Sequence, residues 1–282
     1  MSISREHFSS RIGFILAAAG SAVGIGNLVG FPVNAAKNGG GAFLLMYALF
    51  VFLICLPIMI AEMAVGRNTA KEPVGAFKTL SHGNKLWGAA GFLGVITPFM
   101  IAVFYMVITV WIFGYITLTV TGNLDYLASA EGFGEFINSP YLYVGLIAVS
   151  GIVSLILAAG VKDGIEKAAK ILMPSLLIML VIMVIFVLTL DNSMAGVSFF
   201  IIPDISKITP SVVNGALSQA FFSLSLGMGI LLTYGSYIDK QTNIPNSAKL
   251  VAITDTSVAF IAGLMILPAV FSFNPNVIPS EL

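Results

Sequence analysis

The sequence predicts an all-α integral membrane protein, on the basis of its composition and its long apolar stretches. Of the 282 residues, 58% are hydrophobic and only 9% are charged, and the mean hydropathy is +1.00. So few charges cannot solvate the surface of a soluble domain of this size. Each of seven apolar stretches is long enough to cross a hydrocarbon core, which takes about 20 helical residues. They cover residues 12–36, 41–66, 87–121, 141–160, 165–190, 214–238 and 247–272.

Basic residues are distributed unevenly among the loops that join these stretches. Of the 13 lysines and arginines, all but Lys37 and Lys207 precede the first stretch or lie at the connections between the second and third, fourth and fifth, and sixth and seventh stretches, including the first residues of the fifth and seventh. By the positive-inside rule the N-terminus is cytoplasmic, and seven crossings place the C-terminus outside. We therefore expect a multi-pass protein of the cytoplasmic (inner) membrane. This orientation argues against a seven-helix receptor, whose N-terminus is external.

The first apolar stretch contains a segment that is unsuited to a continuous helix. Three glycines, Gly20, Gly24 and Gly26, lie close together beside Ser21 and Asn27. Each Gly costs about 1 kcal/mol relative to Ala in a helix interior. An unwound segment inside a bilayer also needs protein or a cavity to satisfy its N–H and C=O groups. We expect a binding site here.

Two simpler explanations apply to the same stretch. Basic residues followed by small residues at 17–20 are typical of a cleavable signal peptide, although the apolar run continues well beyond them. The spacings Gly20-x-x-x-Gly24 and Gly26-x-x-x-Gly30 are typical of closely packed membrane helices. Close packing does not exclude a site.

The sixth apolar stretch contains a second fragile segment, from Ser223 to Gly229, which includes Gly227. The two interrupted stretches are five apart and therefore run in opposite directions. This pattern is typical of an inverted-repeat transporter that binds its substrate near the membrane midplane. The N–H groups of half-helix N-termini suit an anion, and the carbonyls of half-helix C-termini suit a cation. A zwitterion and a sodium ion both fit such a site.

Specific motifs surround both fragile segments. Those near the first are Arg5, Gly13, the run from Ala22 to Asn27, Phe31-Pro32, the run from Asn38 to Phe43, Pro57, Glu62 and Gly66-Arg67. Those near the second are the run from Phe221 to Gly229, Thr233-Tyr234 and Ser236-Tyr237. Together they resemble the neurotransmitter:sodium symporter family. The resemblance implies a 5+5 inverted-repeat sodium symporter fold, truncated here after the seventh transmembrane helix. Residues 1–190 would form the first five-helix repeat, and 191–282 would begin the second, incomplete repeat.

The resemblance implies sodium sites and an amino-acid site at the two segments. The first sodium ion would be bound by the carbonyl of Ala22, the side chain of Asn27, the hydroxyl and carbonyl of Ser223, and Asp255. A second sodium ion would take the carbonyls of Gly20 and Val23, with its other ligands beyond the seventh span. The amino acid would contact Ala22, Gly24, Ile25, Gly26, Ile101, Tyr105, Phe222, Ser223, Ser225 and Met228. Without the resemblance, Tyr105 and Phe222 would be interpreted as interior packing.

Asp255 stands out even without the resemblance, because an ionisable residue within a span is costly and is a functional candidate by default. In this family, a carboxylate near this position resembles the chloride-independent bacterial arrangement. A departure from the family lies at Gly30, where the outer gate normally has an Arg. The usual closure above the substrate by an Arg and an acid is therefore absent or replaced.

Further residues resemble gating and supporting elements of the family. Arg5, Ser236 and Tyr237 resemble part of the cytoplasmic gate. Glu62 resembles the buried acid that braces the broken sixth span, although an interfacial carboxylate is the simpler explanation. Gly164 and Pro174, separated by nine residues, resemble the element that unwinds to admit cytoplasmic water to the second sodium. An ordinary proline-kinked helix would show the same spacing.

We therefore expect sodium-coupled symport of an amino acid, and we expect symport to require helices beyond Leu282. Met228 and the glycines at 24 and 26 leave room for a hydrophobic or aromatic side chain. The alternative is a transport-incompetent truncated membrane protein, or a subunit of a larger assembly; a homo-oligomer is left open. The net charge of zero does not indicate a nucleic-acid surface. No catalytic cluster or organic cofactor is expected, and we do not expect an enzyme.

Overall fold

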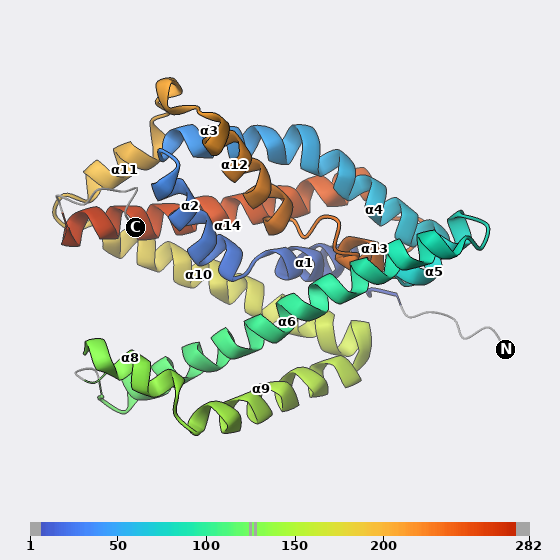
Figure 1. The fold of residues 1–282 in the computed structure, drawn as a ribbon, viewed down its shortest axis with the longest axis horizontal. Coiled ribbons are helices and arrows are strands. Elements are labelled where there is room, and N and C mark those ends of the chain that lie inside the picture. The colour runs from blue at the N-terminus through green and yellow to red at the C-terminus, as the bar shows by residue number, and fades with distance from the viewer. Residues whose placement is uncertain (1–6, 124–125, 127–128, 275–282) are drawn as a thin grey trace.

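The computed structural model describes residues 7–123, 126 and 129–274, and the described residues form a bundle of helices (Figure 1). The first two predicted stretches form α1 (Arg11–Ala22), η1 (Gly26–Gly30) and α2 (Phe31–Lys37), then α3 (Gly41–Phe50), η2 (Val51–Cys55) and α4 (Leu56–Thr69). The next three form α6 (Lys85–Val120), α9 (Tyr141–Ala158), η3 (Val161–Glu166) and α10 (Lys167–Leu188). The last two form α12 (Pro210–Ser223), α13 (Ile230–Gly235) and α14 (Ile244–Phe273). The elements η1, η2 and η3 are π-helical.

Most of these elements meet the requirements for crossing a membrane. Among the described residues, 5 helical segments are long and apolar enough, covering 41–69, 85–120, 141–158, 161–188 and 244–273. The segments 11–22 and 26–37 meet the same requirements only as a pair, and the two helices are bent by 55° relative to each other. The sixth predicted stretch is divided into α12 and α13, which are too short to span individually.

Three segments that the sequence predicts as loops contain short helices. These are α5 (Pro73–Leu80), α8 (Ala130–Ile137) and α11 (Ser193–Ile201). α5 and α8 have N-caps, since Glu72 accepts a hydrogen bond from the backbone N–H of Gly75 and Ser129 accepts one from Gly132. A 3₁₀ turn, η4 (Ile205–Lys207), follows α11. Local capping therefore favours α5 and α8, whereas α11 begins without a side-chain cap at Asn192.

The most central helix is α14, which lies between α10 and the α3–α4 rod in Figure 1. Within its membrane-crossing length 44% of residues are buried, against 6% in both α6 and α9. The helices α1, α2, α4, α10 and α11 pack against α14, and their buried side chains form one continuous apolar core. Because α14 carries Asp255, this carboxylate lies in the interior of the bundle.

Both fragile segments interrupt their helices, as the sequence predicts. After α1, Val23 turns to an extended conformation with φ −74° and ψ 119°. The side chain of Asn27 accepts a hydrogen bond from Gly24 N at 3.1 Å and so closes this turn. Between α12 and α13, three residues adopt positive φ, namely Ser225 at 54°, Gly227 at 74° and Gly229 at 67°. A helix cannot continue through such left-handed residues.

Candidate functional site: a cavity between two broken helices

Both interruptions face one cavity of about 420 Å³. Residues 20–26 line one side of it, and α6 lines another through residues that include Ile101 and Tyr105. Phe222, Ser225 and Met228 contribute from the α12–α13 connection. Its volume lies within the range of small-molecule sites.

The structure brings together nearly all the residues predicted to bind the amino acid. Ala22, Gly24, Ile25, Gly26, Ile101, Tyr105, Phe222, Ser225 and Met228 line the cavity. The exception is Ser223, which is 2% exposed and lies behind the cavity wall. Gly20 and Val23, the predicted partial ligands of a second sodium, also lie at the cavity edge.

The glycines at 24 and 26 allow aromatic side chains to approach the unwound backbone. A Cβ at Gly26 would lie only 3.1 Å from Cε1 of Phe222 and 3.9 Å from the hydroxyl oxygen of Tyr105. At Gly24 the nearest atom would be Cε2 of Tyr105, at 3.8 Å. The backbone of residues 20–26 thus lies close to the rings of Tyr105 and Phe222, and the hydroxyl-bearing side chains Tyr105, Thr109 and Ser225 also line the cavity.

Behind this cavity, a fully buried polar cluster joins the first broken span to α12, α14 and α3. The Asn27 amide nitrogen donates to Asp255 Oδ1 at 2.8 Å and to the Ser223 hydroxyl at 3.1 Å. The Ser223 hydroxyl donates to Asp255 Oδ2 at 2.8 Å. The hydroxyl of Tyr47 donates to the same oxygen at 3.2 Å. The sequence did not identify Tyr47, because a tyrosine within an apolar stretch has no signal that separates it from packing residues.

The chemistry of this cluster fits a monovalent cation. Asp255 is fully buried, and in the described part of the chain no Lys or Arg forms an ion pair with it. An uncompensated buried carboxylate is costly, by several kcal/mol. Carboxylate, hydroxyl and amide oxygens are hard ligands of the kind that such an ion prefers. The amide oxygen of Asn27 faces Gly24 N rather than Asp255, so this side chain would have to rotate to become a ligand.

A buried amide that the sequence did not identify links the same helices on the other side. Gln219 of α12 donates from Nε2 to the carbonyl of Gly26 at 3.0 Å, and its Oε1 accepts from Asn34 Nδ2 at 3.0 Å. A Cβ at Gly30 would lie 3.8 Å from Gln219 Oε1. Beside Gly30, where the family resemblance implies an arginine, the neutral amides of Gln219 and Asn34 therefore form the hydrogen bonds between these helices.

The predicted supporting residues occupy the region around α13 and η3. Oε1 of Glu62 accepts a hydrogen bond from Gly227 N, at 2.7 Å, in the α12–α13 connection. The backbone N–H of Phe8 donates to the carbonyl of Tyr237 at 3.4 Å. Ser236 donates from its hydroxyl to the carbonyl of Thr233 at 2.6 Å. Arg5 lies outside the described residues.

The predicted Gly–Pro element spans a π-helical turn and the start of an α-helix. Gly164 lies within η3, where a Cβ would approach the carbonyl oxygen of Ile156 to 1.9 Å. Pro174 lies within α10. The unwinding that the family resemblance implies for this element stays a prediction.

Comparisons with known proteins show which family this chain resembles in sequence and fold. A sequence model described as the sodium:neurotransmitter symporter family matches residues 5–138 and 135–278. An uncharacterized sodium-dependent transporter, YhdH of Bacillus subtilis (strain 168), is 38% identical, covering 98% of this chain and 62% of the relative. One from Haemophilus influenzae is 37% identical, covering 98% of this chain and 64% of the relative.

A solved structure is also similar. The crystal structure of MhsT in complex with L-phenylalanine has a TM-score of 0.87 and 45% identity, covering 99% of this chain and 64% of that chain. The chain thus spans a little under two thirds of the length of these relatives. The helical symporter fold predicted from the sequence is confirmed by this similarity. On the family match and the shared fold, the chain belongs to the sodium:neurotransmitter symporter family, whose members are integral membrane transporters and not enzymes.

Proposed function

We propose that this protein takes part in the sodium-coupled symport of a hydrophobic or aromatic amino acid across the cytoplasmic membrane, with its N-terminus in the cytoplasm. The observation that carries the proposal is the position of Asp255. Its uncompensated carboxylate lies within hydrogen-bonding distance of Asn27 and Ser223, directly behind the cavity between the two broken spans. A cation bound there would be adjacent to the carboxylate of an amino acid in the cavity.

The site residues would divide the work by their chemistry. Backbone N–H groups of Ile25 and Gly26 and the hydroxyl of Tyr105 would bind the substrate carboxylate. The carbonyl of Ala22 and the hydroxyl of Ser225 would bind its amine. Sodium would connect the substrate to Asp255, so the ion and the amino acid would bind cooperatively.

The apolar lining supports the choice of side chain. Ile101, Phe222 and Met228 line the cavity. The side chain of Phe222 is 40% exposed. An aromatic substrate side chain would make favourable contacts with the Phe222 ring and with the flexible thioether of Met228. The solved relative MhsT was crystallised with L-phenylalanine. We therefore infer the same class of substrate here.

Equilibrium binding of tritiated L-phenylalanine to the purified chain tests the proposal. We expect binding in sodium chloride and little in potassium chloride, with competition by L-tryptophan and L-leucine but not by L-aspartate or L-lysine. Gly26→Ala should weaken binding about tenfold, the factor that corresponds to about 1.4 kcal/mol, because the new Cβ displaces the Phe222 ring. Gly134→Ala is the matched control, since no described residue other than its own helix backbone and chain neighbours lies within 4 Å of its Cβ position. Equal binding in potassium would overturn sodium coupling.

A further inference from the structure

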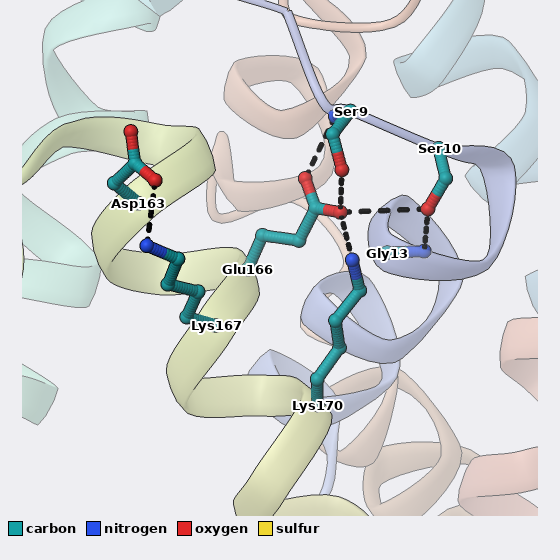
Figure 2. Close-up of polar contacts among 7 residues, drawn as sticks. All are labelled: Ser9, Ser10, Gly13, Asp163, Glu166, Lys167 and Lys170. Atoms are coloured by element: carbon teal, nitrogen blue, oxygen red, sulfur yellow. Dashed lines mark hydrogen bonds and ion pairs between the residues drawn. The ribbon is translucent and has the colours of Figure 1, made fainter.

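A second buried carboxylate, Glu166, lies outside the cavity and contacts the segment that leads into α1 (Figure 2). It is the last residue of η3 and is fully buried. Its Oε2 accepts a hydrogen bond from Ser9 N at 2.7 Å. Its Oε1 accepts bonds from the hydroxyl of Ser9, from the hydroxyl of Ser10 at 3.4 Å and from Lys170 Nζ at 2.6 Å. One carboxylate thus joins two spans that are more than 150 residues apart in sequence.

The first turn of α1 is adapted to this carboxylate. A Cβ at Gly13 would lie only 1.9 Å from Oε1 of Glu166, so the approach requires a glycine there. Ser10 is the N-cap of α1 and accepts a bond from Gly13 N at 3.0 Å. A negative charge at the N-terminal end of a helix is favoured by the helix dipole. Glycine, serines and dipole therefore all favour the same contact.

A neighbouring acid shows what such a residue does without this contact. Asp163, on the same π-helical turn, pairs with Lys167 at 2.8 Å, and both side chains are at least 60% exposed. Figure 2 shows this pair on the η3–α10 helix itself, apart from the serines of the α1 segment. An exposed pair of this kind contributes little to stability.

The Glu166 contact closes one end of the α1–α10 interface. Gly20 lies further along that interface, where its Cβ position is 3.5 Å from Cγ of Met173 and 4.0 Å from Cβ of Ala169. Gly13 and Gly20 are seven residues apart, about 10 Å along a helix. The carbonyl of Gly20 is one of the predicted ligands of the second sodium. Water that enters between α1 and α10 from the end at Glu166 would therefore reach that carbonyl.

We propose that Glu166 is a positioning residue that clamps the cytoplasmic ends of α1 and α10 together, and that release of its bonds to Ser9 and Ser10 opens this interface to cytoplasmic water. The inference rests on the proposed function for the sidedness of the membrane. The clamp itself rests on the contacts above. When the hydrogen bonds to Ser9 and Ser10 break, the Glu166 carboxylate still has its ion pair with Lys170. Breaking them therefore does not leave the buried carboxylate without a counter-charge.

A cysteine-accessibility experiment tests the clamp. Ala17, which is 2% exposed, lies between Gly13 and Gly20 on the same helix face. In a Cys55→Ser, Ala17→Cys background, a membrane-impermeant thiol reagent is applied to inverted vesicles without sodium or amino acid. Glu166→Gln should raise the labelling rate about tenfold, the factor expected for one lost charge-assisted hydrogen bond. Asp163→Asn removes the same charge from the same turn and should leave the rate unchanged.

Two further variants keep the proposal testable if Glu166→Gln does not fold. Ser9→Ala with Ser10→Ala, and separately Gly13→Ala, should each raise the labelling rate about threefold or more, while Gly151→Ala, whose Cβ position is open, should not. Equal labelling across the clamp variants and their controls overturns the proposal. Because labelling needs no ligand, a failure of L-phenylalanine binding in the unmodified chain would overturn the proposed function and leave the clamp standing.

Discussion

Two carboxylates in the described part of the chain are fully buried, and they differ in how their charge is compensated. Glu166 has Lys170 at 2.6 Å in addition to its serine donors. Among the residues that the structure describes, Asp255 receives hydrogen bonds only from the neutral groups of Asn27, Ser223 and Tyr47. Since a buried charge without a counter-charge is costly, Glu166 forms a complete structural contact, whereas Asp255 is suited to bind a cation.

The positions of the two acids fit this difference. Asp255 lies midway along α14, beside a cavity and two interrupted helices. Glu166 lies at the end of η3 and contacts the start of α1. In our two proposals, a buried carboxylate therefore binds a cation at Asp255 and attaches two helices at Glu166, and the presence of a lysine partner distinguishes the two roles. The following predictions test this contrast, in order of decreasing effect.

Removal of the central carboxylate should have the largest effect. Asp255→Ala should raise the sodium concentration for half-maximal L-phenylalanine binding by about 100-fold or more, because it removes the one charged side chain among the proposed sodium ligands in the described part of the protein. Ser257→Ala, two residues along α14 on an exposed position, should leave it unchanged. Titration of tritiated L-phenylalanine binding with sodium makes the measurement. An unchanged sodium dependence would remove Asp255 from the site.

Removal of the counter-charge of Glu166 should affect stability rather than sodium binding. Lys170→Met leaves the buried carboxylate with hydroxyl and N–H donors only, at a cost of about 1–2 kcal/mol once the partial exposure of Lys170 is considered. The melting temperature should fall by about 2–8 °C, and Glu166→Gln in the same chain should restore part of it. Lys167→Met, which breaks the exposed pair with Asp163, is the control. Equal falls in melting temperature for Lys170→Met and Lys167→Met would mean that the buried ion pair of Glu166 contributes no more to stability than the exposed pair of Asp163.

Removal of a neutral hydrogen-bond donor to Asp255 should strengthen sodium binding. Tyr47→Phe takes away the bond at 3.2 Å, which leaves the sodium-free state less satisfied. The half-maximal sodium concentration should therefore fall, by about threefold to tenfold. Tyr143→Phe, on an exposed position of α9, is the matched control. A rise in the half-maximal sodium concentration of Tyr47→Phe would show instead that Tyr47 stabilises the sodium-bound state.

The smallest expected effect is that of the anion. If the Asp255 carboxylate supplies the negative charge next to sodium, replacing chloride with gluconate should not change L-phenylalanine binding at constant sodium. Parallel isotherms in the two salts make the comparison. A marked loss in gluconate would show that Asp255 does not replace an anion.

Much of the fold could be predicted because it depends on local composition. Apolar length predicted the spans, and clustered glycines predicted interruptions at residues 20–27 and 223–229, close to where α1 and α12 end. The helices α5, α8 and α11 were missed, because at 8, 8 and 9 residues they are much shorter than a membrane span. The cavity-lining residues were predicted through resemblance to the family, and not from the spacing of residues in this chain.

The parts that could not be predicted depend on partners distant in sequence. Tyr47 and Asp255 are 208 residues apart, and Gln219 and Gly26 are 193 apart. Nothing in the local sequence of Tyr47 or Gln219 indicates such a partner. Glu166 was also overlooked, because an acid near Lys162, Lys167 and Lys170 is typical of a solvated loop.

By itself, the sequence determined that the chain enters a membrane, where its spans lie and where two of them break. These properties follow from transfer free energy and helix propensity, which are summed over neighbouring residues. Only the tertiary structure decided that Glu166 faces Lys170 and the serines before α1, that Gly13 makes room for it, and that the described donors to Asp255 are all neutral. Those outcomes depend on how the helices pack, because packing selects which distant groups share a buried space and must satisfy one another.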